Sequence, residues 1–230
     1  MGVVHYAGAL MPAIIRSFEE AGRTLVLRDL GTHLELLLDQ VPILTSAALG
    51  TELAFGKLAR ELTSRSAARV LIGGLGFGAT LASALSVLSA EAEVIVVEKL
   101  AVVVELVRTG AVPTQPGLLD DPRVRLVQAD VADVLASERD LDVALLDVDN
   151  GPEWASFRTN ARLYAAEGLR VACAALAPGG ACAVWSGYPV DRFLGRLRQA
   201  DMLASIVPLY ENGRIRARAY VGRRPPTVRV

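Results

Sequence analysis

The sequence contains few cysteine, histidine and aromatic residues and carries almost no net charge, which argues against several common classes of protein. Cysteine and histidine occur twice each in 230 residues, and aromatic residues make up 5%. The formal net charge is only -1, so the overall charge does not favour a nucleic acid or an anionic membrane surface as partner. The low aromatic content also argues against surfaces that stack on unpaired bases.

The few cysteines and histidines form no metal-binding pattern. Cys173 and Cys182 lie in apolar segments, where we expect small core residues in a reducing compartment. His5 and His33 are far apart in the sequence. We therefore predict that the protein has no metal site.

A secretion signal and long apolar segments are also missing. Charged residues interrupt every apolar stretch before it reaches the length of a membrane span. The first residues, MGVVHYAGALMPAIIRSF, contain no basic region and no clear signal core. We expect a cytoplasmic protein that does not enter a membrane.

Apolar residues are abundant, at 52% of the chain, and their pattern predicts the fold. From residue 69, apolar runs of strand length alternate with segments of helical periodicity, the longest at residues 160–176. Nearly continuous runs such as RVLIGG and AEVIVVE are typical of parallel strands covered on both faces. ASIVPLYENGRIRARAYVGR predicts a closing antiparallel hairpin with a turn at ENG. The prediction is an α/β fold with a Rossmann-like sheet.

Residues 23–46 differ from the rest, because short β-rich runs alternate there with turn residues, which predicts a small hairpin or meander. We expect an N-terminal segment at residues 1–48, a Rossmann-like domain at residues 49–222 and a tail at residues 223–230. An exposed β-element in the first segment would suit a homodimer.

A glycine-rich stretch marks the best candidate for a binding site. In VLIGGLGFGAT, the glycines Gly73, Gly74, Gly76 and Gly78 follow an apolar run and precede a helical segment. Ligands bind at the carboxyl ends of strands in such sheets, and glycine lets the backbone approach a ligand closely. The N–H groups at the start of the helix favour a negative or polar ligand group.

Acidic residues end the next two predicted strands. Glu98 follows the glycines by about 20 residues, the position of an acid that binds ribose hydroxyls. Asp130 is placed to accept a hydrogen bond from an adenine amine. Together these residues describe an adenosine site. The alternative is that both acids only cap strand ends and helices.

The order of the motifs resembles that of the spermidine synthase family of class I S-adenosylmethionine-dependent transferases. The motifs are GGLGFG, VVE, DPRVRLVQAD, LLDVDNGP, LY at 163–164 and LAPGGACAVW. LELLLDQVPILTSAALGTEL, which includes Glu52, is similar to the family's N-terminal β-region. The resemblance covers roughly residues 20–222. It implies a seven-stranded sheet, a small N-terminal β-domain, an adenosyl sulfonium donor, no metal and commonly a dimer.

The resemblance also implies the catalytic residues. In this family an amine attacks a carbon bonded to the sulfonium, and a carboxylate at the end of the fourth strand orients the amine or accepts its proton. Asp147 occupies this position in LLDVDNGP, where it would also contact the donor. Asp149 is a second candidate. The alternative for Asp147 is a helix cap or a loop carboxylate.

The candidate residues for the acceptor pocket are expected at the same edge of the sheet as the other site residues. Asp149 and Asn150 lie in the loop after the fourth strand, Tyr164 belongs to LY, and Trp185 follows the fifth strand. Ordinary packing explains Tyr164 and Trp185 equally well.

The chain departs from the family at two positions. Gly76 stands where GGGDGG has an aspartate that would hold the ammonium of decarboxylated S-adenosylmethionine, and Asn150 replaces the second acid of DSxDP. Both changes reduce negative charge, so we favour intact S-adenosyl-L-methionine and methyl transfer to a small molecule such as an amine.

Three alternatives stay open. The first is a polyamine aminopropyltransferase that uses the decarboxylated donor, or an aminocarboxypropyl transfer. The second is a module that binds the adenosyl group without catalysis. The third is an NAD-dependent oxidoreductase, against which the closing hairpin argues.

Overall fold

The computed structural model describes residues 13–148, 150–153 and 160–226. The chain divides into two compact units, residues 1–48 and 49–230. Within the described ranges, no helix combines the length and the apolar character that a membrane crossing requires.

The first unit is a four-stranded antiparallel meander. Its strands are β1 (Ala13–Glu20), β2 (Arg23–Asp29), β3 (Leu34–Leu38) and β4 (Val41–Thr45), in that order. Asp39 and Gln40, between β3 and β4, both have positive φ, as the tight turns that match strand twist require. The prediction of a meander at residues 23–46 is confirmed, and β1 is an additional strand.

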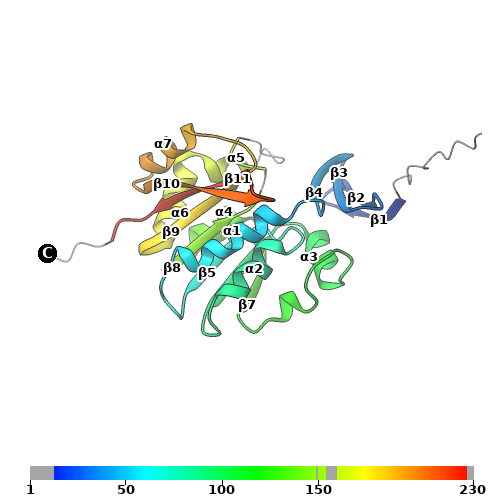
Figure 1. Ribbon diagram of the computed structural model, residues 1–230, viewed down its shortest axis with the longest axis horizontal. Helices are drawn as coiled ribbons and strands as arrows, with labels where there is room; N and C mark the ends of the chain where they lie inside the picture. Colours follow the sequence, from blue (N-terminus) through cyan, green and yellow to red (C-terminus); the bar gives the residue numbers. More distant parts are fainter. Residues whose placement is uncertain (1–12, 149, 154–159, 227–230) are drawn as a thin grey trace, which may run out of the picture. The chain divides into compact units, whose positions relative to one another are not determined.

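The second unit contains the seven-stranded sheet, in the order β10-β11-β9-β8-β5-β6-β7 (Figure 1). Its strands are β5 (Arg69–Gly73), β6 (Glu93–Glu98), β7 (Val124–Gln128), β8 (Leu141–Leu146), β9 (Leu176–Ser186), β10 (Leu203–Glu211) and β11 (Arg214–Arg223). Strands β5 to β9 are parallel, and β11 and β10 close the sheet antiparallel. The predicted Rossmann-like sheet with a closing hairpin is therefore confirmed.

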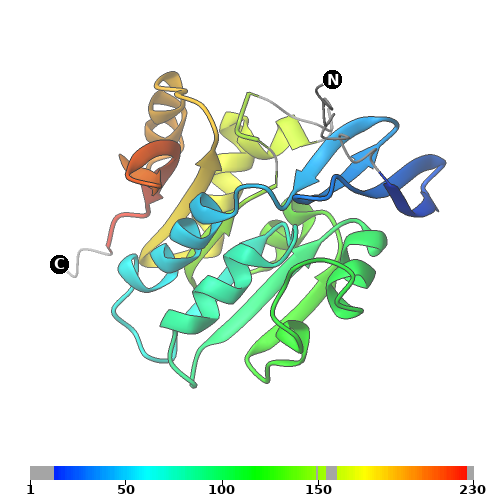
Figure 2. The same ribbon diagram turned by 45° about the vertical axis from the view of Figure 1, so that its right-hand side comes forward.

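Helices cover both faces of this sheet (Figures 1 and 2). They are α1 (Gly50–Glu61), α2 (Ala79–Val87), α3 (Ala101–Arg108), α4 (Val131–Ser137), α5 (Ala161–Tyr164), α6 (Ala166–Ala175) and α7 (Arg192–Gln199), with a 3-10 turn, η1, at Leu118–Asp120. Leu135, Leu169 and Phe193, from α4, α6 and α7, pack in one buried cluster with strand residues of one face. The two figures place α1 and α2 on the opposite face.

The predicted continuous helix at residues 160–176 is wrong, because the chain breaks at Ala165, which has an extended backbone. A Cβ atom on Gly168 would lie 2.2 Å from the carbonyl oxygen of Arg162. The sharp turn between α5 and α6 therefore depends on a contact that helical periodicity does not reveal.

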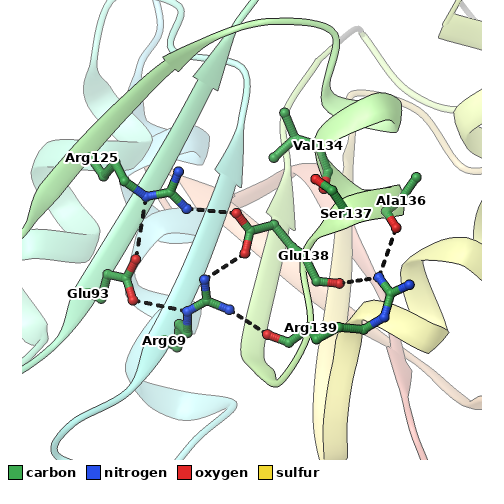
Figure 3. A network of polar contacts seen from close by, with 8 residues as sticks. All are labelled: Arg69, Glu93, Arg125, Val134, Ala136, Ser137, Glu138 and Arg139. Carbon is green, nitrogen blue, oxygen red and sulfur yellow. Dashed lines mark hydrogen bonds and ion pairs between the residues drawn. The ribbon is translucent and has the colours of Figure 1, made fainter.

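A ring of ion pairs joins the amino-terminal ends of the strands (Figure 3). Arg69, at the start of β5, donates to Glu93 at 3.0 Å and to Glu138 at 2.6 Å. Arg125, on β7, donates to Glu138 at 2.7 Å and lies 3.5 Å from Glu93. Partial burial acts to raise the pKa of Glu138, but the hydrogen bonds from Arg125 and Arg69 leave that pKa below its usual value. The ring therefore ties three strands to the end of α4.

We expect Glu138→Gln to lower the free energy of unfolding by about 1 kcal/mol at neutral pH. The folded-state pKa of Glu138 lies below its unfolded value, so the ionised group stabilises the fold above the unfolded pKa. This contribution disappears as the pH falls through the folded-state pKa. Urea unfolding at neutral and strongly acidic pH measures the difference. Glu91→Gln, at an exposed position, is the control, and an equal loss for Glu138→Gln at both pH values would contradict the prediction.

Candidate functional site

The candidate site lies at the carboxyl ends of four neighbouring parallel strands. The glycine loop at residues 73–78 follows β5, Glu98 ends β6, Asp130 comes shortly after β7, and Asp147 directly follows β8. The connections from β5 run to β6 and β7 on one side of the sheet, whereas β8 and β9 lie on the other side. Loops separate at such a reversal, which is where open α/β sheets bind ligands. The structure therefore brings the predicted residues to one edge.

Gly74 is required by a backbone contact with Asp147. Gly74 has a φ of 91°, and an added Cβ atom would lie 2.1 Å from the carbonyl oxygen of Asp147. The N–H of Asp147 donates to the carbonyl of Gly73 at 2.8 Å. The glycine loop and the end of β8 are thus in direct contact, with no room for a side chain at Gly74.

Packing within the protein also explains Gly73 and Gly78. A Cβ atom on Gly73 would lie 2.6 Å from Val131, and one on Gly78 would lie 2.7 Å from Thr114 and Leu118. Gly76 and Gly78 both have positive φ. Gly78 precedes α2 and provides no side-chain cap, so the first N–H groups of this helix suit a negative or polar ligand group.

Glu98 braces the glycine loop. Its carboxylate is 9% exposed and accepts hydrogen bonds from the N–H groups of Leu75 at 3.0 Å and Leu100 at 2.8 Å. Its bracing contacts fit the capping alternative, and its place at the edge fits the proposed adenosine site.

Asp130 caps α4 and bears two ion pairs. It accepts from the N–H of Ala132 at 3.0 Å, and its other oxygen lies 3.2 Å from Lys99 and 3.1 Å from Arg162. Partial burial acts to raise the pKa of Asp130, but these hydrogen bonds leave it below its usual value. An adenine amine would therefore share this carboxylate with two cations.

Asp147 has a different environment from the other two acids. The hydroxyl of Thr80, the second residue of α2, donates to its Oδ2 at 2.7 Å. Burial raises the pKa of Asp147 to about 7, and the nearby charge of Glu52 acts in the same direction against the Thr80 hydrogen bond. Asp147 can therefore exchange a proton near neutral pH.

Glu52, in the first turn of α1, adds negative charge to the site. Burial raises its pKa, Glu211 raises it further, and a hydrogen bond from Thr51 opposes the shift. No ion pair holds Glu52 or Asp147 within the described ranges. In the same residues, no group of three or more His, Cys, Asp or Glu side chains is arranged to hold a metal. Because Glu52 and Asp147 repel each other, a cationic group of a ligand would lower the cost of their charges.

The turn after Asp147 lies against the end of β9. The carbonyl of Asn150 accepts from the N–H of Gly187 at 3.1 Å, and a Cβ atom on Gly151 would lie 2.4 Å from Oγ of Ser186. Asn150 is exposed. Asp149, the second catalytic candidate, lies outside the described residues.

The two aromatic candidates have different surroundings. Tyr164 is 1% exposed, and its ring packs edge-to-face on Phe193 with centroids 6.2 Å apart, so packing accounts for its position. Trp185 is half-buried, and its buried indole Nε1 has no hydrogen-bond partner in the described part of the chain. A buried donor without an acceptor is uncommon, which supports Trp185 as a candidate pocket residue.

No family model and no curated protein matches the chain. Solved structures of spermidine synthases do match it. A spermidine synthase in complex with the transition state analogue AdoDATO is 19% identical, with a TM-score of 0.69 over 93% of this chain and 73% of that chain. Spermidine synthase from Thermotoga maritima is 20% identical, with a TM-score of 0.69 over 91% and 72% of the chains. A probable spermidine synthase from Corynebacterium glutamicum is 19% identical, with a TM-score of 0.65 over 92% and 80%. The fold is therefore spermidine synthase-like, which confirms the resemblance.

We expect Gly74→Ala to destabilise the protein far more than Gly110→Ala. Both glycines have positive φ, but a Cβ atom on Gly110 would meet nothing within 4 Å. Gly110→Ala should cost about 1 kcal/mol from backbone strain alone. Gly74→Ala should cost about 2 kcal/mol more, because the methyl group displaces the end of β8. Denaturant unfolding of both variants measures this, and equal losses would show that Gly74 and Asp147 do not pack closely.

The raised pKa of Asp147 predicts how stability depends on pH. The native state keeps a proton up to about pH 7, whereas the unfolded chain releases it near the usual value of about 3.9. Stability should therefore fall as the pH rises between these values. Asp147→Asn removes this effect, so the variant should gain about 2 kcal/mol relative to the wild type near pH 8 and much less near pH 4. Denaturant unfolding at both pH values measures the gain, and a constant difference would contradict the raised pKa.

Proposed function

We propose that the protein is a transferase that moves a group from an adenosyl sulfonium donor to a small-molecule amine. One observation carries the proposal: Asp147 lies at the reversal point of the sheet, its carboxylate accepts a hydrogen bond from Thr80, and its pKa is about 7. A carboxylate with this pKa can orient an amine and accept its proton at physiological pH.

The reaction would need little more from the protein than alignment and proton acceptance. The amine nitrogen forms a bond to the carbon as the carbon–sulfur bond breaks, and the sulfur keeps the electron pair. The nitrogen then loses a proton, which Asp147 is placed to accept. Because a sulfonium is already a good leaving group, positioning of the two reactants supplies most of the rate enhancement.

The residues around Asp147 fit an adenosyl donor. The uncapped N–H groups at the start of α2 would face its polar tail, and Glu98 and Asp130 would bind the ribose and the adenine. Gly76 contributes no carboxylate beside that tail, which favours a donor that retains its own carboxylate. We therefore prefer S-adenosyl-L-methionine as donor and methyl transfer as the reaction.

Aminopropyl transfer from decarboxylated S-adenosylmethionine is the second candidate. The similar solved structures are named as spermidine synthases, and one of them holds AdoDATO. Glu52 favours this candidate too, because a second carboxylate near Asp147 suits an ammonium on the donor tail. Aminocarboxypropyl transfer and a non-catalytic adenosyl-binding module are further alternatives.

A homodimer and a cytoplasmic location remain predictions.

Thermal shift measurements with four compounds test the donor class. We expect S-adenosyl-L-methionine to raise the unfolding temperature more than its decarboxylated form, methylthioadenosine or NAD, since a ligand that binds the native state stabilises it by mass action. Glu98→Gln should weaken the binding by about tenfold. A preference for the decarboxylated donor would favour aminopropyl transfer, and no shift with any adenosyl sulfonium compound would refute the proposal.

Mass spectrometry of the spent donor tests the group that is transferred. Methyl transfer leaves S-adenosylhomocysteine, whereas aminopropyl or aminocarboxypropyl transfer leaves methylthioadenosine. Asp147→Asn should lower kcat by about 100-fold or more. Full activity of this variant would exclude Asp147 as the proton acceptor.

A further inference from the structure

We propose that Thr80 is a positioning residue that holds the Asp147 carboxylate through a hydrogen bond in both protonation states of Asp147. The sequence motifs assign no functional role to Thr80. The part it plays in the reaction rests on the proposed function, whereas its effect on Asp147 does not.

Within the described residues, Thr80 is the one side chain that hydrogen-bonds the Asp147 carboxylate. Thr80 is 3% exposed, and its Oγ1 lies 2.7 Å from Oδ2 of Asp147. In the described ranges, no other hydrogen bond reaches the Asp147 side chain. Loss of the Thr80 hydroxyl would leave the carboxylate free to rotate about its side-chain bonds.

The hydroxyl of Thr80 can form a hydrogen bond with Asp147 whether Asp147 is ionised or protonated. Oγ1 also lies 3.4 Å from the carbonyl oxygen of Glu52. When Asp147 is ionised, the hydroxyl hydrogen points to Oδ2. When Oδ2 takes up a proton, the carboxylic acid can donate to Oγ1, and the hydroxyl hydrogen can turn to the Glu52 carbonyl. The positions of the oxygen atoms therefore need not change when Asp147 gains or loses a proton.

Close packing between α1 and α2 holds the backbone of Thr80 in place. A Cβ atom on Gly56 of α1 would lie 2.3 Å from the carbonyl oxygen of Thr80 and 2.8 Å from Cβ of Ser83. The hydroxyl of Ser83 donates to the carbonyl of Leu53 at 2.5 Å. Threonine has few χ1 rotamers because it is branched at Cβ, and the contacts of Oγ1 with Asp147 and with the Glu52 carbonyl favour the rotamer that the structure shows.

The charged groups that face Asp147 make this hydrogen bond matter. Glu52 lies near Asp147 and repels its charge, and Glu211 acts in the same way on Glu52. Glu211 itself accepts from the N–H of Gly50 at 3.0 Å. Among these groups, the Thr80 hydroxyl is the one that favours the ionised form of Asp147, because a hydrogen bond to a charged carboxylate is stronger than one to the neutral acid. Its removal should therefore move the Asp147 titration upward.

Carboxyl carbon NMR of the full chain tests the proposal without any activity assay. The Asp147 signal is assigned by its absence from the Asp147→Asn spectrum and is titrated in the wild type, Thr80→Val and Thr80→Ser. Thr80→Val keeps the shape and removes the hydroxyl, so we expect the midpoint to rise by about 0.5–1 pH unit. Thr80→Ser should restore it. An unchanged midpoint in Thr80→Val would overturn the proposal.

Ser83→Ala is the matched control. It removes a hydroxyl from the same helix, but that hydroxyl donates to the carbonyl of Leu53 and not to Asp147. This variant should lose stability while the Asp147 midpoint stays in place. An equal shift in Ser83→Ala would mean that helix packing controls the titration and would overturn the role of the Thr80 hydroxyl.

The pH profile of turnover then links Thr80 to the reaction. In Thr80→Val, kcat should fall by about tenfold and its ascending limb should move to higher pH, with little change in KM. Thr80→Ser should recover most of the activity. If the wild type has no transferase activity, the proposed function fails while the NMR titration still decides the role of Thr80. If kcat and its profile are unchanged in Thr80→Val, Thr80 has no part in the reaction.

Discussion

The backbone contact between Gly74 and Asp147 is the constraint on which the candidate site depends. The parallel pairing of β5 with β8 extends to Gly73 and Leu146, and one further hydrogen bond joins the N–H of Asp147 to Gly73. With no side chain at Gly74, the glycine loop lies directly on the end of β8. The same loop leads into α2, and α2 carries Thr80 to the Asp147 carboxylate.

The three acids at this edge have unequal electrostatic roles. Glu98 and Asp130 accept hydrogen bonds from backbone N–H groups, and Asp130 also pairs with two cations. Among the described residues, Asp147 has one neutral donor and an acidic neighbour. A carboxylate whose pKa is raised in this way destabilises the fold at neutral pH, and such arrangements are concentrated at functional sites. The acids with several partners hold the loops in place, and the acid with few partners, Asp147, is the one that we propose to be reactive.

The sequence predicts those features that depend on local pattern and fails where distant residues decide. Apolar runs predict the parallel strands, and ENG predicts the final hairpin because Asn212 and Gly213 can both adopt positive φ. Strand β1 escapes prediction because its residues are mostly exposed and show no alternation. The ion pairs of Asp130 involve Lys99 and Arg162, whose proximity only the fold creates. Thr80 escapes because a threonine in the first turn of a helix is ordinary.

The comparison of Gly76 with the family's aspartate illustrates the same limit for function. Taken alone, the glycine removes a carboxylate from the donor end and argues for a donor with its own carboxylate. In the folded chain, α1 brings Glu52 near Asp147, so a helix distant in sequence also contributes negative charge to the site. A cation of either kind, an amine acceptor or an ammonium on the donor, would lower the cost of keeping both acids charged. The charge of the site therefore supports an amine substrate more strongly than it distinguishes between the two donors.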